Sequence, residues 1–165
     1  MKKTSLILTL IAVLGVSAFG QEIKPIRISA IGGAMLFGGS GIGLEYAIPF
    51  SKSTLGIELQ GLNVANNDAE CPWTILAGVA YYPFSEKGDG FFADIFAHYR
   101  FANLDTAGRG FVGATVGWRW IFLRFVNLGA QVGVDYLCYG TSPYQDSNLD
   151  YKVLPRVTFS AGVAF

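Results

Sequence analysis

Charged residues are scarce in this chain. Only 15% of its 165 residues are Asp, Glu, Lys or Arg, and 52% are hydrophobic. A soluble domain usually carries about 25% charged residues. The mean hydropathy of +0.40 agrees with this deficit. So few charges give thin cover to a surface that faces water, and a membrane is therefore the first environment to consider.

Long apolar runs are also missing once the N-terminal residues are passed. A membrane-spanning helix needs about 20 consecutive apolar residues, and no run of that kind follows residue 20. The composition therefore excludes spanning helices from this part of the chain. High hydrophobicity without a helical span is typical of a transmembrane β-barrel, because its strands present a side chain to lipid only at every second position.

Metal-binding residues are too few to form a centre. The chain has one histidine, His98, and two cysteines far apart in sequence, Cys71 and Cys138, whereas a structural zinc site takes four such ligands. We therefore predict no metal and no cofactor. Lysine and arginine do not cluster anywhere, which excludes nucleic acid as a partner.

The two cysteines leave one question open. A disulfide is permitted in an oxidising, extracytoplasmic space. Cys71 falls in a predicted loop, however, and Cys138 falls near the end of a predicted strand distant from that loop. The spacing does not decide whether they form a bridge.

The first 20 residues predict a cleavable signal peptide. Lys2 and Lys3 precede an apolar stretch, Leu6 to Phe19, that is too short to span a bilayer. Ala18 and Gly20 supply the small residues expected before a cleavage site. We expect residues 1–20 to be removed and residues 21–165 to form one exported domain; an uncleaved anchor is the alternative.

From residue 21 onward, apolar residues recur at every second position. This period indicates strands with two different faces. The alternating segments lie near residues 26–36, 41–50, 54–65, 73–83, 91–101, 110–122, 126–138 and 153–165. In lipid, the edges of such a sheet must close on each other. The sequence therefore predicts an all-β fold, namely a closed eight-stranded antiparallel up-and-down transmembrane β-barrel.

The connections between these strands are expected to differ at the two ends of the barrel. Periplasmic turns should be shorter than outer loops. The predicted turns are residues 50–53, 84–90 and 123–125, and the predicted outer loops are residues 37–40, 65–72, 102–109 and 140–151. The 84–90 turn is longer than ideal, and the first outer loop is very short.

Charges fall on only one face of the predicted strands. They are Arg27, Glu45, Glu58, Asp94, Arg100, Arg119, Asp135 and Arg156. At roughly 2–4 kcal/mol for an Arg at the bilayer midplane and less for an acid, turning this face to lipid would cost on the order of 15 kcal/mol. That rivals the whole stability of a domain, about 5–15 kcal/mol. We therefore predict a structural network of paired charges inside the barrel, with His98 on the same face as a hydrogen-bonding residue.

Aromatic residues gather near the predicted strand ends, as in the interfacial girdles of membrane barrels. One group is Phe50, Tyr81, Tyr82, Phe84, Phe91, Phe92, Trp118, Trp120, Phe122 and Phe165, and the other is Phe37, Trp73, Phe101, Tyr136, Tyr139 and Tyr144. We predict that each group marks one membrane interface.

The final strand carries a family resemblance. Its alternating residues are Val157, Phe159, Ala161, Val163 and the terminal Phe165. In this respect the chain from about residue 26 resembles the eight-stranded outer-membrane barrels of the OmpA transmembrane domain and OmpX class. The stretches at residues 81–84 and 90–92 look like hairpins of uncharacterised small outer-membrane barrel families. The resemblance implies that the barrel-assembly machinery recognises the C-terminal strand as its signal.

The sequence offers no clear catalytic group. Lipid A deacylases of the PagL type are eight-stranded barrels with a lipid-facing His-Ser-Glu arrangement, in which the serine lies two residues after the histidine. That position is Arg100 here, and its parity points His98 inward. We therefore expect a non-enzymatic outer-membrane protein with a structural or surface-interaction role.

Three alternatives remain at this stage. They are a PagL-like lipid-modifying enzyme, a narrow pore, and a soluble periplasmic lipocalin-like binder, which also has eight strands. The leading hypothesis predicts a monomer in the bacterial outer membrane, with membrane lipid and the assembly machinery as its partners.

Overall fold

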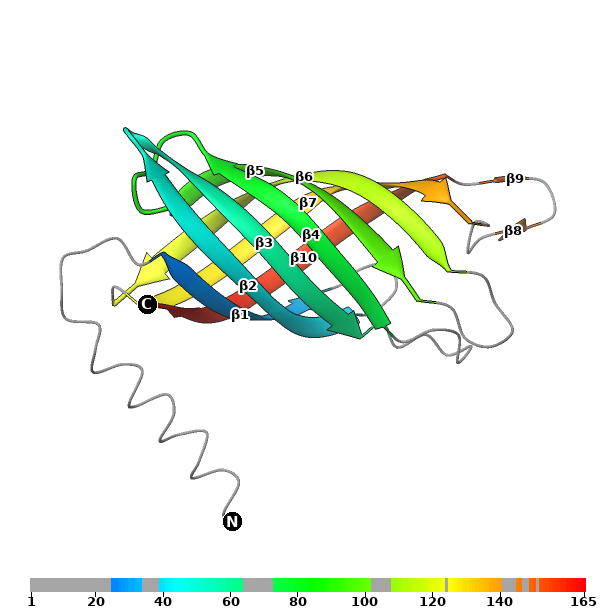
Figure 1. Ribbon diagram of the computed structural model, residues 1–165, viewed down its shortest axis with the longest axis horizontal. Coiled ribbons are helices and arrows are strands. Elements are labelled where there is room, and N and C mark those ends of the chain that lie inside the picture. The colour runs from blue at the N-terminus through cyan, green and yellow to red at the C-terminus, as the bar shows by residue number, and fades with distance from the viewer. Residues whose placement is uncertain are drawn as a thin grey trace, which may run out of the picture.

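A computed structural model of the chain describes residues 25–33, 39–63, 73–101, 108–123, 125–140, 145–146, 149–150 and 152–165. Eight antiparallel strands close into one barrel, in the order β1-β10-β7-β6-β5-β4-β3-β2 (Figure 1). The all-β, closed eight-stranded fold predicted from the alternation is thus confirmed. The predicted signal peptide, residues 1–20, lies outside the described residues.

The barrel strands have the bounds β1 Ile26–Gly33, β2 Gly39–Phe50, β3 Ser53–Asn63, β4 Trp73–Tyr82, β5 Gly90–Arg100, β6 Arg109–Phe122, β7 Val126–Tyr139 and β10 Val153–Ala164. A separate two-stranded sheet pairs β8, Gln145–Asp146, with β9, Leu149–Asp150. No helix in the described part of the chain is long and apolar enough to cross a membrane.

Two predicted loop boundaries were wrong. Gly39 and Ser40 belong to β2, where they pair with Gly33 and Gly32 of β1, because a run of small residues can continue a strand as well as form a turn. Arg109 is the first residue of β6 and pairs with Arg100. The predicted 140–151 loop also contains β8 and β9, which are too short for a sequence period to reveal.

The two ends of the barrel differ. The β2–β3, β4–β5 and β6–β7 connections lie at the same end as the C-terminus, and β8 and β9 lie at the opposite end (Figure 1). We call these the turn end and the loop end. Two of the turns place a non-glycine residue in the left-handed region, Ser51 at φ 58° and Leu123 at φ 50°. Ser53 Oγ closes the first turn by donating to the Phe50 carbonyl oxygen at 2.9 Å.

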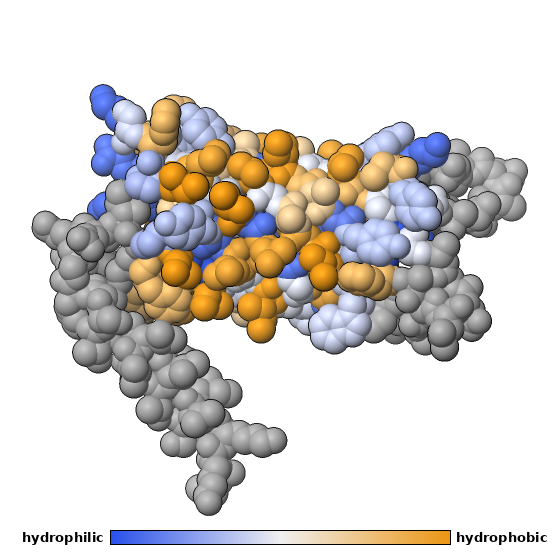
Figure 2. All heavy atoms as spheres, in the orientation of Figure 1, coloured by the Kyte–Doolittle hydropathy of each residue, from blue (hydrophilic) through white to orange (hydrophobic). Residues whose placement is uncertain are grey.

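Burial alternates along every barrel strand, and the outward face is apolar. Large hydrophobic side chains are exposed on all eight barrel strands; examples are Ile28, Leu44, Ile57 and Val132. On the face drawn in Figure 2, apolar residues gather over the middle of the barrel wall and hydrophilic residues lie mainly toward its ends. The inward face instead carries most of the charges of the strands.

Inward-facing glycines make room for the bulky side chains of the lumen. A Cβ placed on Gly113 would lie 2.5 Å from Phe96 Cζ and 2.6 Å from the Val134 carbonyl oxygen. A Cβ on Gly117 would lie 2.7 Å from Phe92 Cζ, and one on Gly56 would lie 2.7 Å from Glu45 Oε1. Glycine therefore occurs at wall positions where any side chain would clash with a large side chain of another strand.

We predict that Gly113→Ala destabilises the barrel by about 1–3 kcal/mol, because the new methyl group must displace both a packed ring and a backbone oxygen. Gly61→Ala is the matched control, since a Cβ at Gly61 meets nothing within 4 Å, and it should change the free energy of unfolding by at most about 0.5 kcal/mol. Urea titration of the folded fraction measures both. Equal stability of the two variants would contradict the packing described here.

Candidate functional site

The turn-end half of the lumen is organised around one carboxylate. Glu45 on β2 accepts hydrogen bonds from Arg27 on β1 and Arg119 on β6, one on each oxygen. The Tyr82 hydroxyl on β4 also lies 3.1 and 3.2 Å from the two oxygens. Glu45 is only 5% exposed. Buried ions are tolerated when paired and hydrogen-bonded, and Glu45 meets both conditions.

Two aromatic rings lie beside these guanidinium groups. The Tyr82 ring centroid is 5.4 Å from Arg27 Cζ and 5.3 Å from Arg119 Cζ, and the Phe92 centroid is also 5.3 Å from Arg119 Cζ. Such geometry gives a cation–π attraction in addition to the ion pair. Tyr82 and Phe92 are buried, so their assignment to an interfacial girdle was wrong. Their parity, shared with Thr74 and Asp94, was the signal that identifies them as lumen residues.

The β4–β5 turn folds over the lumen at the turn end. Arg27 donates a second hydrogen bond to the Lys87 carbonyl oxygen, and Thr54 Oγ1 donates to the Ser85 carbonyl oxygen at 2.8 Å. Gly88 is buried with φ +65°, and a Cβ there would overlap the Arg27 guanidinium. This turn, which is longer than the β2–β3 and β6–β7 turns, thus lies against the lumen side chains of β1 and β3.

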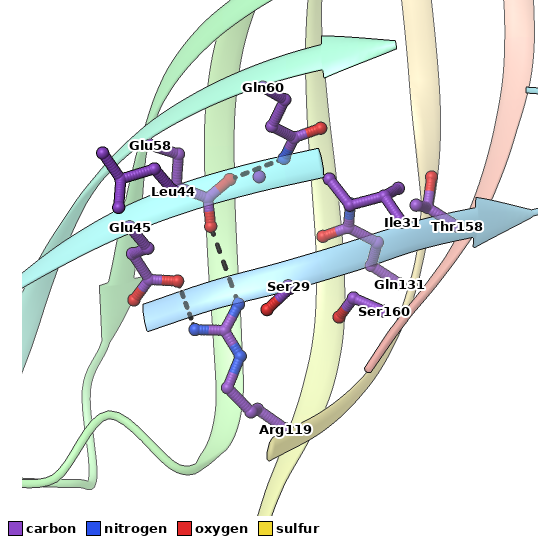
Figure 3. A pocket seen from close by; sticks show the side chains of 11 residues that line it. Ser29, Ile31, Leu44, Glu45, Glu58, Gln60, Arg119, Gln131, Thr158 and Ser160 are labelled. Atoms are coloured by element: carbon purple, nitrogen blue, oxygen red, sulfur yellow. Dashed lines mark hydrogen bonds and ion pairs between the residues drawn. The ribbon is translucent and has the colours of Figure 1, made fainter. Parts of the chain in front are cut away.

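A small polar cavity lies between these charges and the middle of the lumen (Figure 3). Its volume is about 30 Å³, which is room for about one water molecule. Glu58 and Gln60 of β3 line it, with Gln60 Nε2 donating to Glu58 at 3.1 Å and Arg119 Nη2 3.7 Å from Glu58 Oε1. Gln60 Oε1 and Thr158 Oγ1 are buried there without a partner among the described residues.

A second charged cluster occupies the loop-end half of the lumen. Asp135 Oδ2 lies 3.4 Å from His98 Nε2 and 3.4 Å from Arg156 Nη1. The His98 ring stacks on Phe111 with centroids 4.6 Å apart and an interplanar angle of 4°. Arg156 Cζ lies 4.5 Å above the Phe96 ring. His98 and Arg156 therefore each lie against an aromatic ring and near the Asp135 carboxylate.

An apolar group lines one side of the lumen at its loop end, next to this second cluster. Phe111 on β6, Leu137 on β7 and Leu154 on β10 are all buried and in mutual contact. They occupy the inward face near the loop end of their strands. The lumen of the described barrel therefore holds two charged clusters, with the β4–β5 turn at one end and a small hydrophobic cluster on one wall at the other.

The remaining two residues of the predicted network differ from the others. Asp94 is 2% exposed and receives a long contact of 3.5 Å from Thr115 Oγ1, but no ion pair of the described residues includes it. Arg100 is half-buried at the end of β5. The structure thus brings Arg27, Glu45, Glu58 and Arg119 into one cluster, and His98, Asp135 and Arg156 into another.

The C-terminal strand completes the barrel through its backbone. Phe165 N donates to the Ile26 carbonyl oxygen at 2.8 Å, and Ile26 N donates to the Phe165 carbonyl oxygen at 3.2 Å. The five residues of the predicted assembly signal, Val157, Phe159, Ala161, Val163 and Phe165, alternate with the lumen-facing positions of β10. Phe159 is 54% exposed on the outer wall.

The geometry around His98 does not resemble a hydrolase site. His98 is buried in the lumen between Phe111 and Asp135, and the residue two positions later is Arg100 rather than a serine. Among the described residues, no group of three or more His, Cys, Asp or Glu side chains could hold a metal ion. Cys138 is a free, exposed thiol whose Sγ lies 3.2 Å from the Gly110 carbonyl oxygen; Cys71, its predicted candidate partner, lies outside the described residues.

Comparisons of the chain with protein-family models, with curated proteins and with solved structures found no match.

We predict that Glu45→Gln destabilises the barrel by about 3 kcal/mol, because it leaves Arg27 and Arg119 buried without their shared counter-charge. Glu86→Gln is the control, since Glu86 is an exposed acid in the β4–β5 turn, and it should change stability by less than about 0.5 kcal/mol. The urea concentration at the unfolding midpoint reports both. If Glu45→Gln unfolds at the wild-type midpoint, the carboxylate does not hold the lumen together.

Proposed function

We propose that this chain is an integral protein of the bacterial outer membrane with a structural or surface-interaction role and no catalytic activity. The observation that supports this most strongly is the inverted distribution of polarity. Large apolar side chains are exposed on the outer wall of every barrel strand, while Arg27, Arg156 and Glu45 are at most 5% exposed inside. In this proposal the two lumen clusters are the polar core of the barrel.

The apolar wall is the wrong surface for water. Soluble monomers rarely expose contiguous apolar patches larger than a few hundred Å², whereas a membrane barrel presents an apolar band about 25 Å tall. A transmembrane strand needs about 9–11 tilted residues, and β2 to β7 and β10 each have 10 to 14. Strand length and surface chemistry therefore both support a location in a lipid bilayer.

The interior argues against the lipocalin-like alternative. A binder of that type needs an apolar cavity large enough for a ligand. The lumen here is lined by ion pairs around Glu45 and Asp135, and the polar cavity beside Glu45 is about 30 Å³. An apolar wall around a charged lumen fits a membrane barrel better than a barrel that binds an apolar ligand inside.

The enzyme alternative draws no support from the lumen. A lipid-modifying histidine has to meet lipid and a nucleophile, whereas His98 stacks on Phe111 inside the barrel and contacts Asp135. We propose that His98 serves lumen packing against Phe111 and Asp135; the hydrogen-bonding role expected from the sequence is not seen, because neither ring nitrogen has a hydrogen-bond partner among the described residues.

In the orientation that we propose, the turn end faces the periplasm and the loop end, with β8 and β9, faces the cell surface.

Heat-modifiability tests the proposal directly. The protein should fractionate with outer membranes and migrate on an SDS gel at a different apparent mass before and after boiling, because a closed barrel resists SDS until it is heated. Urea-unfolded protein, loaded without boiling, is the control. Recovery in the soluble periplasm with no heat shift would make a lipocalin-like binder the better interpretation.

We also predict no steady conductance in planar bilayers. The β4–β5 turn and the Arg27–Glu45–Arg119 group lie across the lumen at the turn end, and the His98–Asp135–Arg156 cluster occupies its loop-end half. An open porin inserted in the same bilayer serves as the positive control. Regular single-channel steps from the purified barrel would show instead that the lumen conducts and that the pore alternative is correct.

A further inference from the structure

The outer wall is hollowed at the turn end, between the β4–β5 turn and the end of β6. The hollow has a volume of about 550 Å³, and five aromatic residues line it: Phe84, Phe91, Trp118, Trp120 and Phe122. All five are exposed. We call this feature the rim groove. It lies at the border of the apolar wall, where the headgroups of a bilayer would begin.

A break in strand pairing forms one side of the rim groove. The pairing of β5 with β6 stops at Gly90 and Arg119, whereas β6 continues to Phe122 with β7 as its partner. In an antiparallel sheet, alternate residues direct their N–H and C=O groups to opposite sides. The stretch from Trp120 to Phe122 therefore presents backbone polar groups toward the groove, and no backbone hydrogen bond between described residues joins it to the β4–β5 turn.

An acid lies on the opposite side of the rim groove. Asp89 is half-buried and lines the groove, and Ser85 Oγ donates a hydrogen bond to its Oδ1 atom. No ion pair of the described residues includes Asp89. The groove thus combines a carboxylate that lacks a counter-charge in the described chain with aromatic walls.

These features together suit a zwitterionic group. Aromatic faces and a carboxylate attract an organic ammonium, and unpaired backbone N–H groups are suitable donors to phosphate oxygens. We propose that the rim groove binds the phosphoethanolamine headgroup of a phospholipid, with its ammonium at Asp89 and its phosphate toward the exposed edge of β6. This inference rests on the proposed membrane location, because only then does such a lipid reach the groove.

The test uses the full barrel reconstituted into vesicles of equal parts phosphatidylethanolamine and phosphatidylglycerol. After extraction in a mild detergent, mass spectrometry counts the headgroups that remain bound. Wild-type protein should retain phosphatidylethanolamine over phosphatidylglycerol on the order of fivefold. Asp89→Asn should bring the ratio close to one, and Trp118→Leu should lower it severalfold.

Two variants serve as matched controls. Glu86→Gln removes an exposed acid from the same turn but outside the groove, and Trp73→Leu removes an exposed aromatic from the other end of the barrel. Both should keep the wild-type ratio. A loss of preference in either control as large as that in Asp89→Asn would overturn the assignment to the rim groove.

The gel shift separates the two possible failures. If wild-type protein inserts and shows the heat shift but retains both lipids in the vesicle ratio, or if Asp89→Asn keeps the preference, the headgroup site is wrong and the membrane proposal stands. If the protein neither associates with the vesicles nor shifts on heating, the proposed function is wrong and the headgroup site falls with it.

Discussion

The shared ion pair at Glu45 is the interaction on which the turn-end half of the lumen depends. Glu45 joins Arg27 and Arg119, so one carboxylate links β1, β2 and β6 across the inside of the barrel. Arg27 then reaches the β4–β5 turn, and Arg119 reaches Glu58 and the rings of Tyr82 and Phe92. An unpaired ion is costly in a low-dielectric interior. Substituting one of these charged partners alone would therefore leave another buried and unpaired, so they can be replaced only as a group.

The architecture was predictable from the sequence because a strand has a period of two and the chain repeats it eight times. The charged strand residues were predicted to share one face, and the structure buries them inside the barrel, with Arg100 half-buried. Strand bounds differ from the prediction by only a few residues, since side-chain alternation continues to the last paired residue. Glycine-rich ends were harder, because Gly39 and Ser40 have no alternation to read.

The contents of the candidate site could be predicted better than its connections. Alternation says that Glu45 and Asp135 point inward, but it does not say which arginine each one meets, because that depends on barrel stagger and on side-chain reach. The apolar residues of the lumen were overlooked for a different reason. Phe96, Phe111 and Leu137 look like lipid-facing residues by type, and only their parity places them inside. The rim groove depends on unequal strand lengths, which no local pattern encodes.

The span of the lumen contacts along the chain has a consequence for folding. The hydrogen bonds of Glu45 reach residues 18, 37 and 74 positions away, and Arg27 reaches Lys87 over 60 positions. Contacts of such high order form only after long loops have closed, which slows folding and makes it cooperative. Until β6 is in place, Glu45 lacks one of its two arginines, so partly assembled barrels gain little from the charges that stabilise the finished one. Ion pairing here stabilises the completed barrel rather than the early stages of its assembly.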